Sequence, residues 1–341
     1  MTEELARRRV GRTDLEVTVL GLGGAPLGDL YEKIPDARAW ATIEAAWQAG
    51  IRLFDTAPLY GHGLSEHRMG EVLRSKPRDS FVLSTKIGRV LEAADPRTID
   101  RGQWAGGLPM RWRFDYTAAG TRRSIEDSLQ RLGLERIDIV FVHDLDAWWC
   151  PTAEIFEQRL RELMNGGWKV LDELRAAGAI RAIGLGVNAV EPCLRLAREA
   201  DPDVFLLAGR YTLLEQGGLD DLVPLARAKG FSFLLGGPFN SGILATGAVP
   251  GARYDYKPAP PEILERVRRI EAVCARHGVP LKAAAIRFPL GLDRVAAIVP
   301  GAARPEEVEE NRRLVSWPIP RAFWEELVAE GLLAEGAPLP L

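Results

Sequence analysis

The sequence predicts a single-domain α/β protein, a closed (β/α)8 barrel over residues 1–341, and three observations lead to this prediction. About eight short apolar runs recur along the chain, and amphipathic segments with helical periodicity separate them. The runs are continuously apolar instead of alternating, as expected where both faces of a parallel sheet are covered. These features favour a barrel with its helices outside the strands.

The predicted strands begin near residues 19, 51, 81, 137, 180, 204, 231 and 295. Several segments between them end in glycine, as helices commonly do, for example TRRSIEDSLQRLG and LDDLVPLARAKG. Alternating strands and helices imply parallel pairing through right-handed crossovers. The alternative is a doubly wound sheet, but GLGGAPLG at 21–28 lacks the GxGxxG spacing of the dinucleotide-binding version of that fold.

Three long stretches follow predicted strands, at 88–116, 144–156 and 237–260. In a barrel such loops lie on the face where ligands bind, and long ones usually have a function. The first two contain four tryptophans, which we interpret as pocket walls, with anchoring of the loops to the barrel rim as the alternative. They are Trp104, Trp112, Trp148 and Trp149.

Composition excludes several classes of protein. The formal net charge of -3 gives no electrostatic reason to bind nucleic acid or anionic lipid. No apolar stretch approaches the ~18 residues of a membrane span, and the N-terminus has no signal-peptide pattern. The three cysteines and four histidines have no disulfide or metal-site spacing, so we predict no metal. We expect a cytoplasmic protein that acts on a small molecule; its oligomeric state is left open.

Titratable side chains end three consecutive predicted strands: Asp55, Lys86 and His143, with Tyr60 in the turn after Asp55. Neighbouring strands lie about 5 Å apart, so these side chains can converge. We expect the lysine to lower the pKa of the tyrosine, the aspartate to hold the lysine, and the histidine to orient a substrate oxygen. Such a site suits proton transfer at a carbonyl or hydroxyl whose carbon gains or loses hydride. Separately, each residue also has a structural explanation.

The residues resemble the aldo-keto reductase superfamily. The similarity comprises FDTAPLYGHGLSE at 54–66, TK in LSTKIG, the histidine of IDIVFVHD, DSLQRLGLERID at 127–138, IRAIG, and IVPGAARPEEVEEN at 298–311. It extends over nearly the whole chain. It implies a barrel that uses a nicotinamide cofactor, with Asp55, Tyr60, Lys86 and His143 as catalytic residues and Tyr60 as the general acid or base.

Two segments suit the phosphates of the cofactor, because loops after the last barrel strands commonly bind phosphate. They are PFNSGIL at 238–244 and PGAARPEEVEEN at 300–311, where a helix predicted from about Pro305 adds a favourable N-terminal dipole. By resemblance, Asn188 binds the nicotinamide carboxamide. The resemblance also implies that the pyrophosphate and adenosine contacts include Pro238, Phe239, Asn240, Gly242, Leu244, Gly301, Arg304, Glu307, Glu310 and Asn311.

The cofactor segment also departs from the family pattern. Gly236 stands where many relatives carry an aromatic residue that stacks on the nicotinamide. Gly301 and Glu307 fall where relatives that prefer NADP place cations, although Arg304 remains. Because a carboxylate opposes binding of a dianionic phosphate, we expect either NAD or NADP to bind, with a preference for NAD.

Within the superfamily, GRYTLLEQ, GLGVN and FNSGIL resemble the branch containing D-threo-aldose 1-dehydrogenases, L-fucose or L-galactose dehydrogenases and pyridoxal 4-dehydrogenase. This resemblance implies oxidation of the anomeric carbon of an aldose to a lactone. Alternatives are oxidation of pyridoxal, general NADPH-dependent aldehyde reduction, and a noncatalytic binding role. From loop position we expect Trp148 and Trp149 to stack on the substrate, and Arg113, Asp144 and Asn240 to bind its hydroxyls.

Overall fold

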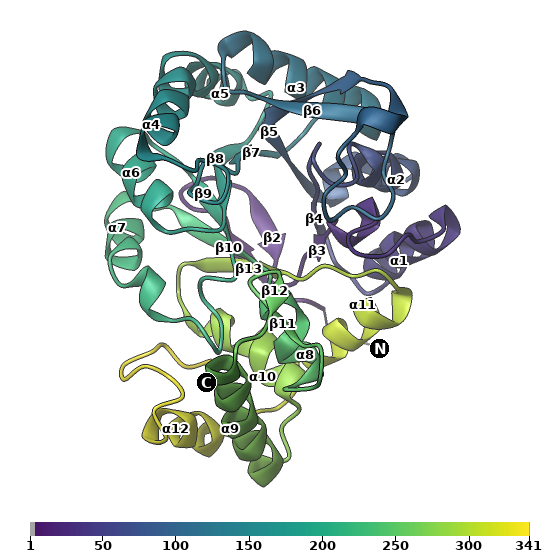
Figure 1. Ribbon diagram of the computed structural model, residues 1–341. Helices are drawn as coiled ribbons and strands as arrows, with labels where there is room; N and C mark the ends of the chain where they lie inside the picture. Colours follow the sequence, from purple (N-terminus) through teal and green to yellow (C-terminus); the bar gives the residue numbers. More distant parts are fainter. Residues whose placement is uncertain (1–3, 341) are drawn as a thin grey trace.

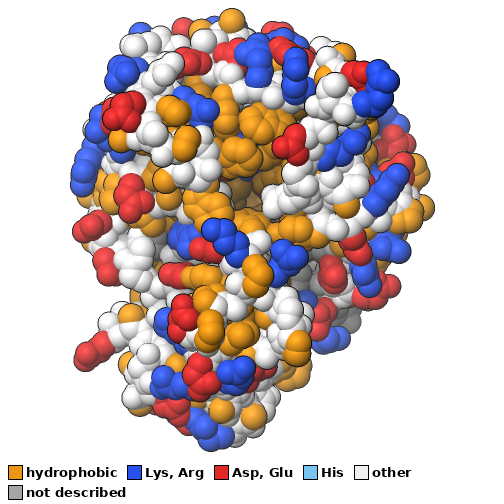
Figure 2. Space-filling view, in the orientation of Figure 1, with side chains coloured by type: hydrophobic (Ala, Val, Ile, Leu, Met, Phe, Trp, Pro, Cys, Tyr) orange, Lys and Arg blue, Asp and Glu red, His pale blue; other side chains and the backbone are white. Residues whose placement is uncertain are grey.

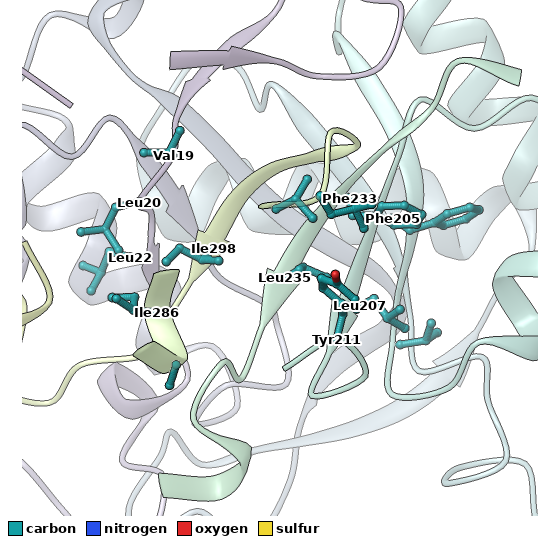
Figure 3. Packing of buried hydrophobic residues seen from close by; sticks show 14 of the residues in the cluster. Val19, Leu20, Leu22, Phe205, Leu207, Tyr211, Phe233, Leu235, Ile286 and Ile298 are labelled. Atoms are coloured by element: carbon teal, nitrogen blue, oxygen red, sulfur yellow. The ribbon is translucent and has the colours of Figure 1, made fainter. Parts of the chain in front are cut away.

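Eight parallel strands form a barrel in the computed structural model, which describes residues 4–340 (Figure 1). Isolated bridges from Leu20 to Ile298 and from Gly23 to Gly301 close the ring between its first and last strands. Figure 3 shows Leu20 and Leu22 beside Ile298 at this seam. In order around the barrel the strands are β3 (Leu22–Gly23), β4 (Leu53–Asp55), β5 (Val82–Ala93), β7 (Ile139–His143), β8 (Ala182–Val187), β9 (Val204–Ala208), β10 (Ser232–Gly236) and β13 (Val295–Val299). The predicted barrel is confirmed.

The barrel strands are apolar throughout because both of their faces are covered. In β7 all five residues are buried. Val140 and Val142 join the large core that includes the helices, whereas Ile139 and Phe141 join a separate cluster made of strand residues and the N-terminal hairpin. Successive strand residues point to opposite faces, so one cluster surrounds the strands and the other fills the barrel.

Helices surround the barrel (Figure 1). Local sequence sets their ends: Thr117 accepts a hydrogen bond from the backbone N of Gly120 at 3.0 Å, and α3 ends at Gly133 in the left-handed region. The helices are α1 (Asp36–Gln48), α2 (Leu64–Leu73), α3 (Ala118–Leu132), α4 (Ala153–Glu162), α5 (Trp168–Ala176), α6 (Glu191–Glu199), α7 (Leu222–Lys229), α8 (Ile243–Thr246), α9 (Pro261–His277), α10 (Leu281–Arg287), α11 (Pro305–Leu314) and α12 (Arg321–Ala329). None of those in the described residues 4–340 has the length and apolarity needed to cross a bilayer.

An antiparallel hairpin that the sequence analysis did not predict closes the N-terminal end of the barrel. It consists of β1 (Arg7–Arg9) and β2 (Glu16–Thr18). The backbone N of Gly11 in its turn donates to the Oγ of Ser232, the first residue of β10, at 2.9 Å. Hydrophobic residues of the hairpin, including Val17, belong to the cluster inside the barrel. The hairpin thus leaves the opposite end of the barrel as the accessible one.

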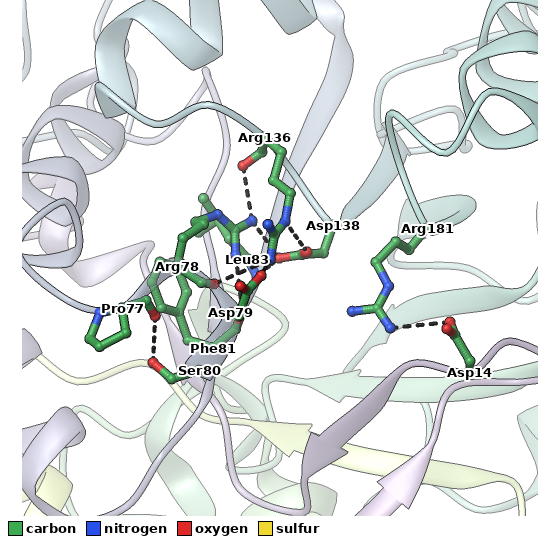
Figure 4. Close-up of polar contacts among 10 residues, drawn as sticks. All are labelled: Asp14, Pro77, Arg78, Asp79, Ser80, Phe81, Leu83, Arg136, Asp138 and Arg181. Carbon is green, nitrogen blue, oxygen red and sulfur yellow. Dashed lines mark hydrogen bonds and ion pairs between the residues drawn. The ribbon is translucent and has the colours of Figure 1, made fainter.

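A buried ion-pair network lies at this same N-terminal end (Figure 4). Asp138 directly precedes β7, and its Oδ2 accepts hydrogen bonds from Arg78 Nη2 at 2.6 Å and from the backbone N of Leu83 at 2.8 Å. Arg136 lies on the other carboxylate oxygen, with Nε 3.4 Å from Oδ1. The network joins the beginnings of β5 and β7.

The three long stretches contain more regular structure than the sequence suggests. β5 does not end at Lys86 as expected: it continues to Ala93 and pairs antiparallel with β6 (Met110–Asp115). The 144–156 stretch runs into α4 at Ala153. The last stretch contains α8 and a short hairpin formed by β11 (Arg253–Tyr254) and β12 (Lys257–Pro258).

Candidate active site

The turn after β4 presents Tyr60 at the C-terminal end of the barrel. A Cβ atom on Gly61 would lie 2.5 Å from the carbonyl oxygen of Gly28, and one on Gly28 would lie 2.5 Å from the carbonyl carbon of Tyr60. Two glycines therefore allow the backbone of the β3 loop to touch the backbone of the β4 loop. This contact fixes the position from which the Tyr60 ring projects.

A buried carboxylate anchors the helix that follows this turn. The Oε1 of Glu66 accepts a hydrogen bond from Thr85 Oγ1 at 2.8 Å, and its Oε2 accepts from Arg131 Nε at 2.6 Å. Thr85 immediately precedes Lys86 on β5, and Arg131 lies on α3. Glu66 thereby links α2 to the strand that carries Lys86.

Lys86 and Asp55 form a buried ion pair across β4 and β5. The Nζ of Lys86 donates to both carboxylate oxygens of Asp55, at 2.9 and 2.8 Å, and to the carbonyl oxygen of Thr56 at 2.8 Å. Ser84 adds a hydrogen bond from its Oγ to Asp55 Oδ1, at 2.7 Å. The same Nζ lies 4.7 Å from the centroid of the Tyr60 ring. All three hydrogens of the ammonium group thus have acceptors within the protein.

The electrostatic environment of Tyr60 differs from the one we expected. Burial, together with the charges of Asp55 and Asp144, raises the pKa of Tyr60 well above its usual value, and Arg89 opposes this rise. The expectation of a lowered pKa was wrong, first because burial disfavours the phenolate and then because the Asp55 carboxylate paired with Lys86 adds a negative charge nearby. In this site Tyr60 is a neutral phenol at physiological pH.

His143 ends β7 and faces Tyr60. Their ring centroids are 5.8 Å apart and the rings are nearly perpendicular, at 82°. Burial lowers the pKa of His143 well below its usual value, and the charges of Arg89 and Lys86 lower it further. A neutral imidazole has one N–H donor and one acceptor nitrogen. The backbone of His143 is held by Tyr116, whose hydroxyl donates to the His143 carbonyl oxygen at 2.8 Å.

A cavity of about 410 Å3 opens beside these residues. Figure 2 shows a hollow in this face of the molecule with hydrophobic side chains gathered around it. Tyr60, Lys86 and His143 border the cavity, whereas Asp55 lies behind Lys86. Most of the other side chains of its wall are apolar or aromatic: Leu30, Leu59, Trp104, Trp112, Trp148, Trp149, Val187, Leu206, Ala208 and Tyr256.

Among the predicted substrate residues, Trp148, Trp149 and Asp144 border the cavity, whereas Arg113 and Asn240 do not. Arg113 lies on the outer face of β6, where it pairs with Glu92 and Asp115 at 2.7 Å each. The period-two alternation of a strand places Trp112 inward and Arg113 outward. Arg113 is therefore not part of the candidate site.

Sequence reasoning missed a buried cation and a buried anion near the cavity. Arg89 pairs with Asp144, with Nη2 2.8 Å from Oδ2. Asp146 fixes the loop after β7, because its Oδ1 accepts from the backbone N of Trp148 at 3.0 Å and its Oδ2 from the backbone N of Asn188 at 2.8 Å. A lone arginine within the apolar run at 87–91 was the available signal for Arg89.

Asn188 lies at the cavity wall with its backbone fixed on both sides. Its N–H donates to Asp146, and its carbonyl oxygen accepts a hydrogen bond from Arg210 Nε at 2.8 Å. The hydrogen bonds of the main chain thus hold the residue in place and leave its carboxamide for other partners. This geometry suits a role in binding the carboxamide of a nicotinamide ring.

The segment predicted to bind pyrophosphate has an unusual backbone. Asn240, Ser241 and Gly242 have φ angles of 44°, 61° and 102°. Two consecutive non-glycine residues in the left-handed region are strained, and such strain clusters at functional sites. Asn240 is buried, and its Oδ1 has no hydrogen-bond partner among the described residues. Pro238, Phe239 and Leu244 flank this turn, and the backbone N of Leu244 donates to the Phe239 carbonyl oxygen at 3.1 Å.

The segment predicted to bind adenosine lies around the start of α11. Gly301 touches the β3 loop, and Glu307 accepts a hydrogen bond from the backbone N of Ala303 at 2.8 Å. Glu310 pairs with Lys282 beside a second cavity of about 550 Å3. The buried Oδ1 of Asn311 has no partner within residues 4–340. Both orphaned amide oxygens therefore belong to residues that the resemblance assigns to the cofactor.

A barrel that places a neutral phenol, a neutral imidazole and a lysine–aspartate pair beside an aromatic cavity has the chemistry of an oxidoreductase acting on a carbonyl or hydroxyl. Residues 19–329 match the sequence model of the Aldo/keto reductase family. The chain belongs to this family and is an NAD(P)-dependent oxidoreductase.

Two similar proteins have named activities. Pyridoxal 4-dehydrogenase from Microbacterium luteolum is 43% identical over 339 residues, which cover 96% of this chain and 98% of that protein. D-threo-aldose 1-dehydrogenase from a Pseudomonas species is 39% identical over 324 residues, which cover 94% and 95% of the two chains.

The fold has a counterpart among solved structures. An aldo-keto reductase from Bacillus halodurans superimposes with a TM-score of 0.77 over 97% of this chain and 98% of that chain, at 22% sequence identity. This likeness supports the fold.

Proposed function

We propose that this protein oxidises the anomeric carbon of an aldose, in its cyclic hemiacetal form, to a lactone with NAD as the hydride acceptor. The observation that carries the proposal is Tyr60 at the wall of an aromatic cavity, with the Lys86 ammonium 4.7 Å from its ring centroid and His143 perpendicular to it. A relative that is 39% identical bears the name of an aldose dehydrogenase.

Tyr60 takes the hydroxyl proton of the hemiacetal. Lys86 lies beside the ring, and Asp55 holds the ammonium group in place by accepting hydrogen bonds from it. His143, being neutral, donates its N–H to the substrate oxygen without adding charge. The residues thus orient the hydroxyl and remove its proton.

A bound nicotinamide would supply the hydride acceptor for the hemiacetal carbon, while Tyr60 carries off the hydroxyl proton, so that the lactone, the reduced cofactor and one proton balance the reaction. Asn188 would hold the carboxamide, the strained turn at 240–242 the pyrophosphate, and Glu310 and Asn311 the adenosine. The orphaned oxygens of Asn240 and Asn311 support this assignment, because buried amides normally have partners.

The adenosine segment favours NAD over NADP. Glu307 places a carboxylate at the start of α11, and Arg304 has Glu32 as an acidic neighbour, with Nη2 3.4 Å from Oε1. A ribose phosphate would meet these negative charges. We expect the enzyme to use NAD at least as well as NADP. A kcat/KM with NADP more than about tenfold higher than that with NAD, or ~1.4 kcal/mol, would contradict this preference.

A second candidate substrate is pyridoxal in its hemiacetal form. The relative that is 43% identical bears the name pyridoxal 4-dehydrogenase, and several tryptophans in the cavity wall suit a flat aromatic ring. Both substrates require the same hydroxyl deprotonation by Tyr60. The identity of the ring therefore has to be measured.

The test is initial-rate formation of NADH at about pH 8 to 9 from L-fucose, L-galactose, D-arabinose, pyridoxal and a simple alcohol, with NADP in parallel. Rapid turnover of an aldose that Tyr60→Phe abolishes supports the proposal. Tyr211→Phe is the matched control, because Tyr211 is buried outside the cavity and its hydroxyl has no partner among the described residues. Turnover of pyridoxal alone selects the second candidate. Reduction of simple aldehydes with NADPH, and no hemiacetal oxidation, overturns both.

A further inference from the structure

The buried cation Arg89 takes no part in the proton transfer proposed for Tyr60. Its side chain is 1% exposed, and its Cζ lies 4.5 Å from the ring centroids of Phe114 and Trp149 and 5.0 Å from that of Trp112. These rings enclose the guanidinium and exclude water. Its anionic partner is Asp144. A buried charge without a counter-ion is costly, so the Asp144 carboxylate stabilises this guanidinium.

Asp144 has a strained backbone directly next to His143. Its φ angle is 53°, in the left-handed region that non-glycine residues seldom adopt. Its backbone N donates to the carbonyl oxygen of Gly186 at 2.9 Å, which ties the strained residue to β8. Strain that the surrounding structure enforces at the end of a barrel strand indicates a function for the side chain.

One carboxylate oxygen of Asp144 remains available to a ligand. Oδ2 is paired with Arg89, whereas Oδ1 lies 3.6 Å from His143 Nε2, which is beyond hydrogen-bonding distance. Asp144 borders the same cavity as Tyr60. Burial raises the pKa of Asp144 to about 6, with Arg89 opposing and Asp146 adding to the rise. At pH 8 the residue therefore presents a carboxylate.

Most of the cavity wall is apolar or aromatic, and the other acceptor side chains in it come from the loop at 100–103 and from Asn188. Once Tyr60 and His143 engage the reacting oxygen, a neighbouring hydroxyl of the sugar needs its own acceptor, since an unpaired buried hydroxyl weakens binding. Asp144 follows His143 in the chain and supplies a charged acceptor at this point. A hydrogen bond to a charged group is stronger than one between neutral groups.

We propose that Asp144, positioned by Arg89, accepts a hydrogen bond from the hydroxyl on the carbon next to the hemiacetal carbon and so selects 2-hydroxy aldoses. This inference rests on the proposed function, because it names a feature of the substrate of that same site. Arg89 is a positioning residue: it acts on the substrate only through Asp144.

The experiment compares kcat/KM at about pH 8 for the best aldose and its 2-deoxy counterpart, in the wild type and in Asp144→Ala. We expect the wild type to prefer the 2-hydroxy sugar by about 10- to 100-fold and the variant to bring the two within about threefold. Arg89→Met should reduce the preference in the same way. Asp146→Asn is the matched control, because it disturbs the same loop and should slow both sugars equally.

A measurement on the wild type alone tests the proposal even if the variants do not fold. Protonation of Asp144 at about pH 5 should shrink the preference for the 2-hydroxy sugar, because its pKa is about 6. Equal rates for both sugars in the wild type, or an unchanged preference in Asp144→Ala, would overturn this inference while leaving the hemiacetal oxidation standing. Oxidation of neither sugar would overturn both proposals.

Discussion

The Nζ atom of Lys86 lies 2.9 and 2.8 Å from the two carboxylate oxygens of Asp55, and the two side chains are almost completely buried. An ion pair in such a place differs from one at the surface, because neither partner can turn to water when the other is removed. The pair therefore affects both stability and catalysis.

Asp55→Asn should destabilise the protein by about 3–5 kcal/mol and lower kcat about 100-fold or more, because it leaves the Lys86 ammonium buried without a counter-ion. Denaturant unfolding and initial rates measure the two effects. The control is Asp95→Asn, which breaks an exposed pair with Arg97 and should leave the free energy of unfolding nearly unchanged, because solvent screens that pair. Equal destabilisation by both variants would contradict the prediction.

The rate of hemiacetal oxidation should rise with pH. Burial and two nearby carboxylates raise the pKa of Tyr60, so the phenol predominates at neutral pH while the oxidation needs the phenolate as base. kcat/KM should increase about tenfold per pH unit from pH 7 to 9, and Tyr60→Phe should remove this dependence. The pKa of His143 is lowered, so His143 should add no limb near pH 6.5. A flat profile would count against Tyr60 as the base.

Trp148 and Trp149 should contribute to the binding of substrate. Each borders the cavity, and Trp148 also packs its ring edge-to-face with Tyr256 at 5.8 Å. Truncation of either residue to alanine should raise the substrate KM about 5- to 50-fold, since an aromatic surface that stacks on the substrate is lost, and leave the cofactor KM within about twofold. Trp40→Ala, at an exposed site on α1, is the control. Unchanged substrate KM values in both variants would show that these two tryptophans do not contact the substrate.

Gly88→Ala should disturb His143 from a distance. Gly88 has a φ of 99°, and a Cβ atom there would lie 2.4 Å from the Tyr116 ring, whose hydroxyl holds the His143 carbonyl. We expect the free energy of unfolding to fall by about 1–3 kcal/mol, measured by denaturant unfolding, and kcat to be lower. Gly102→Ala separates strain from contact, because Gly102 also has a positive φ but open space around it. If the two variants behave alike, backbone strain alone accounts for the effect.

Asp138→Asn should lower stability without changing turnover. The residue binds Arg78 and the backbone of β5 at the N-terminal end of the barrel, away from Tyr60. The asparagine leaves the Arg78 guanidinium without its buried anion, at a cost of about 2–4 kcal/mol. Thermal unfolding should show the loss, while kcat/KM stays within about twofold. A large loss of turnover in the folded variant would contradict the claim that this network acts on stability alone.

The strands were predictable because each is buried on both faces and reads as an apolar run. The N-terminal hairpin was not, because RRR in β1 does not look like a strand: the arginine side chains are largely exposed or reach main-chain oxygens, as Arg8 does with Val295 at 2.7 Å. The part of β5 beyond Lys86 was missed for a different reason: it leaves the barrel and forms a hairpin with β6, outside the alternation of strands and helices.

The predicted site was only partly recoverable from the sequence. Position in the chain correctly brought Tyr60, Lys86 and His143 to one cavity. Position alone could not tell Arg113 from Arg89 as the nearby cation, because that depends on which face of the β5–β6 hairpin each side chain takes. Nor could it give the direction of the pKa shift of Tyr60, which depends on burial and on the nearby charges of Asp55 and Asp144.

The two ends of β7 have different roles, one in stability and one in the candidate active site. Asp138 at its start joins the ion-pair network, and His143 at its finish faces Tyr60, with a core of buried apolar residues between them. The loops that follow the C-terminal end of β7 can be redesigned without altering the ion-pair network around Asp138. The ion-pair network at the N-terminal end of the barrel therefore stabilises the fold independently of the loops at the C-terminal end. Substitutions in those loops that alter substrate specificity and lower stability can then be tolerated.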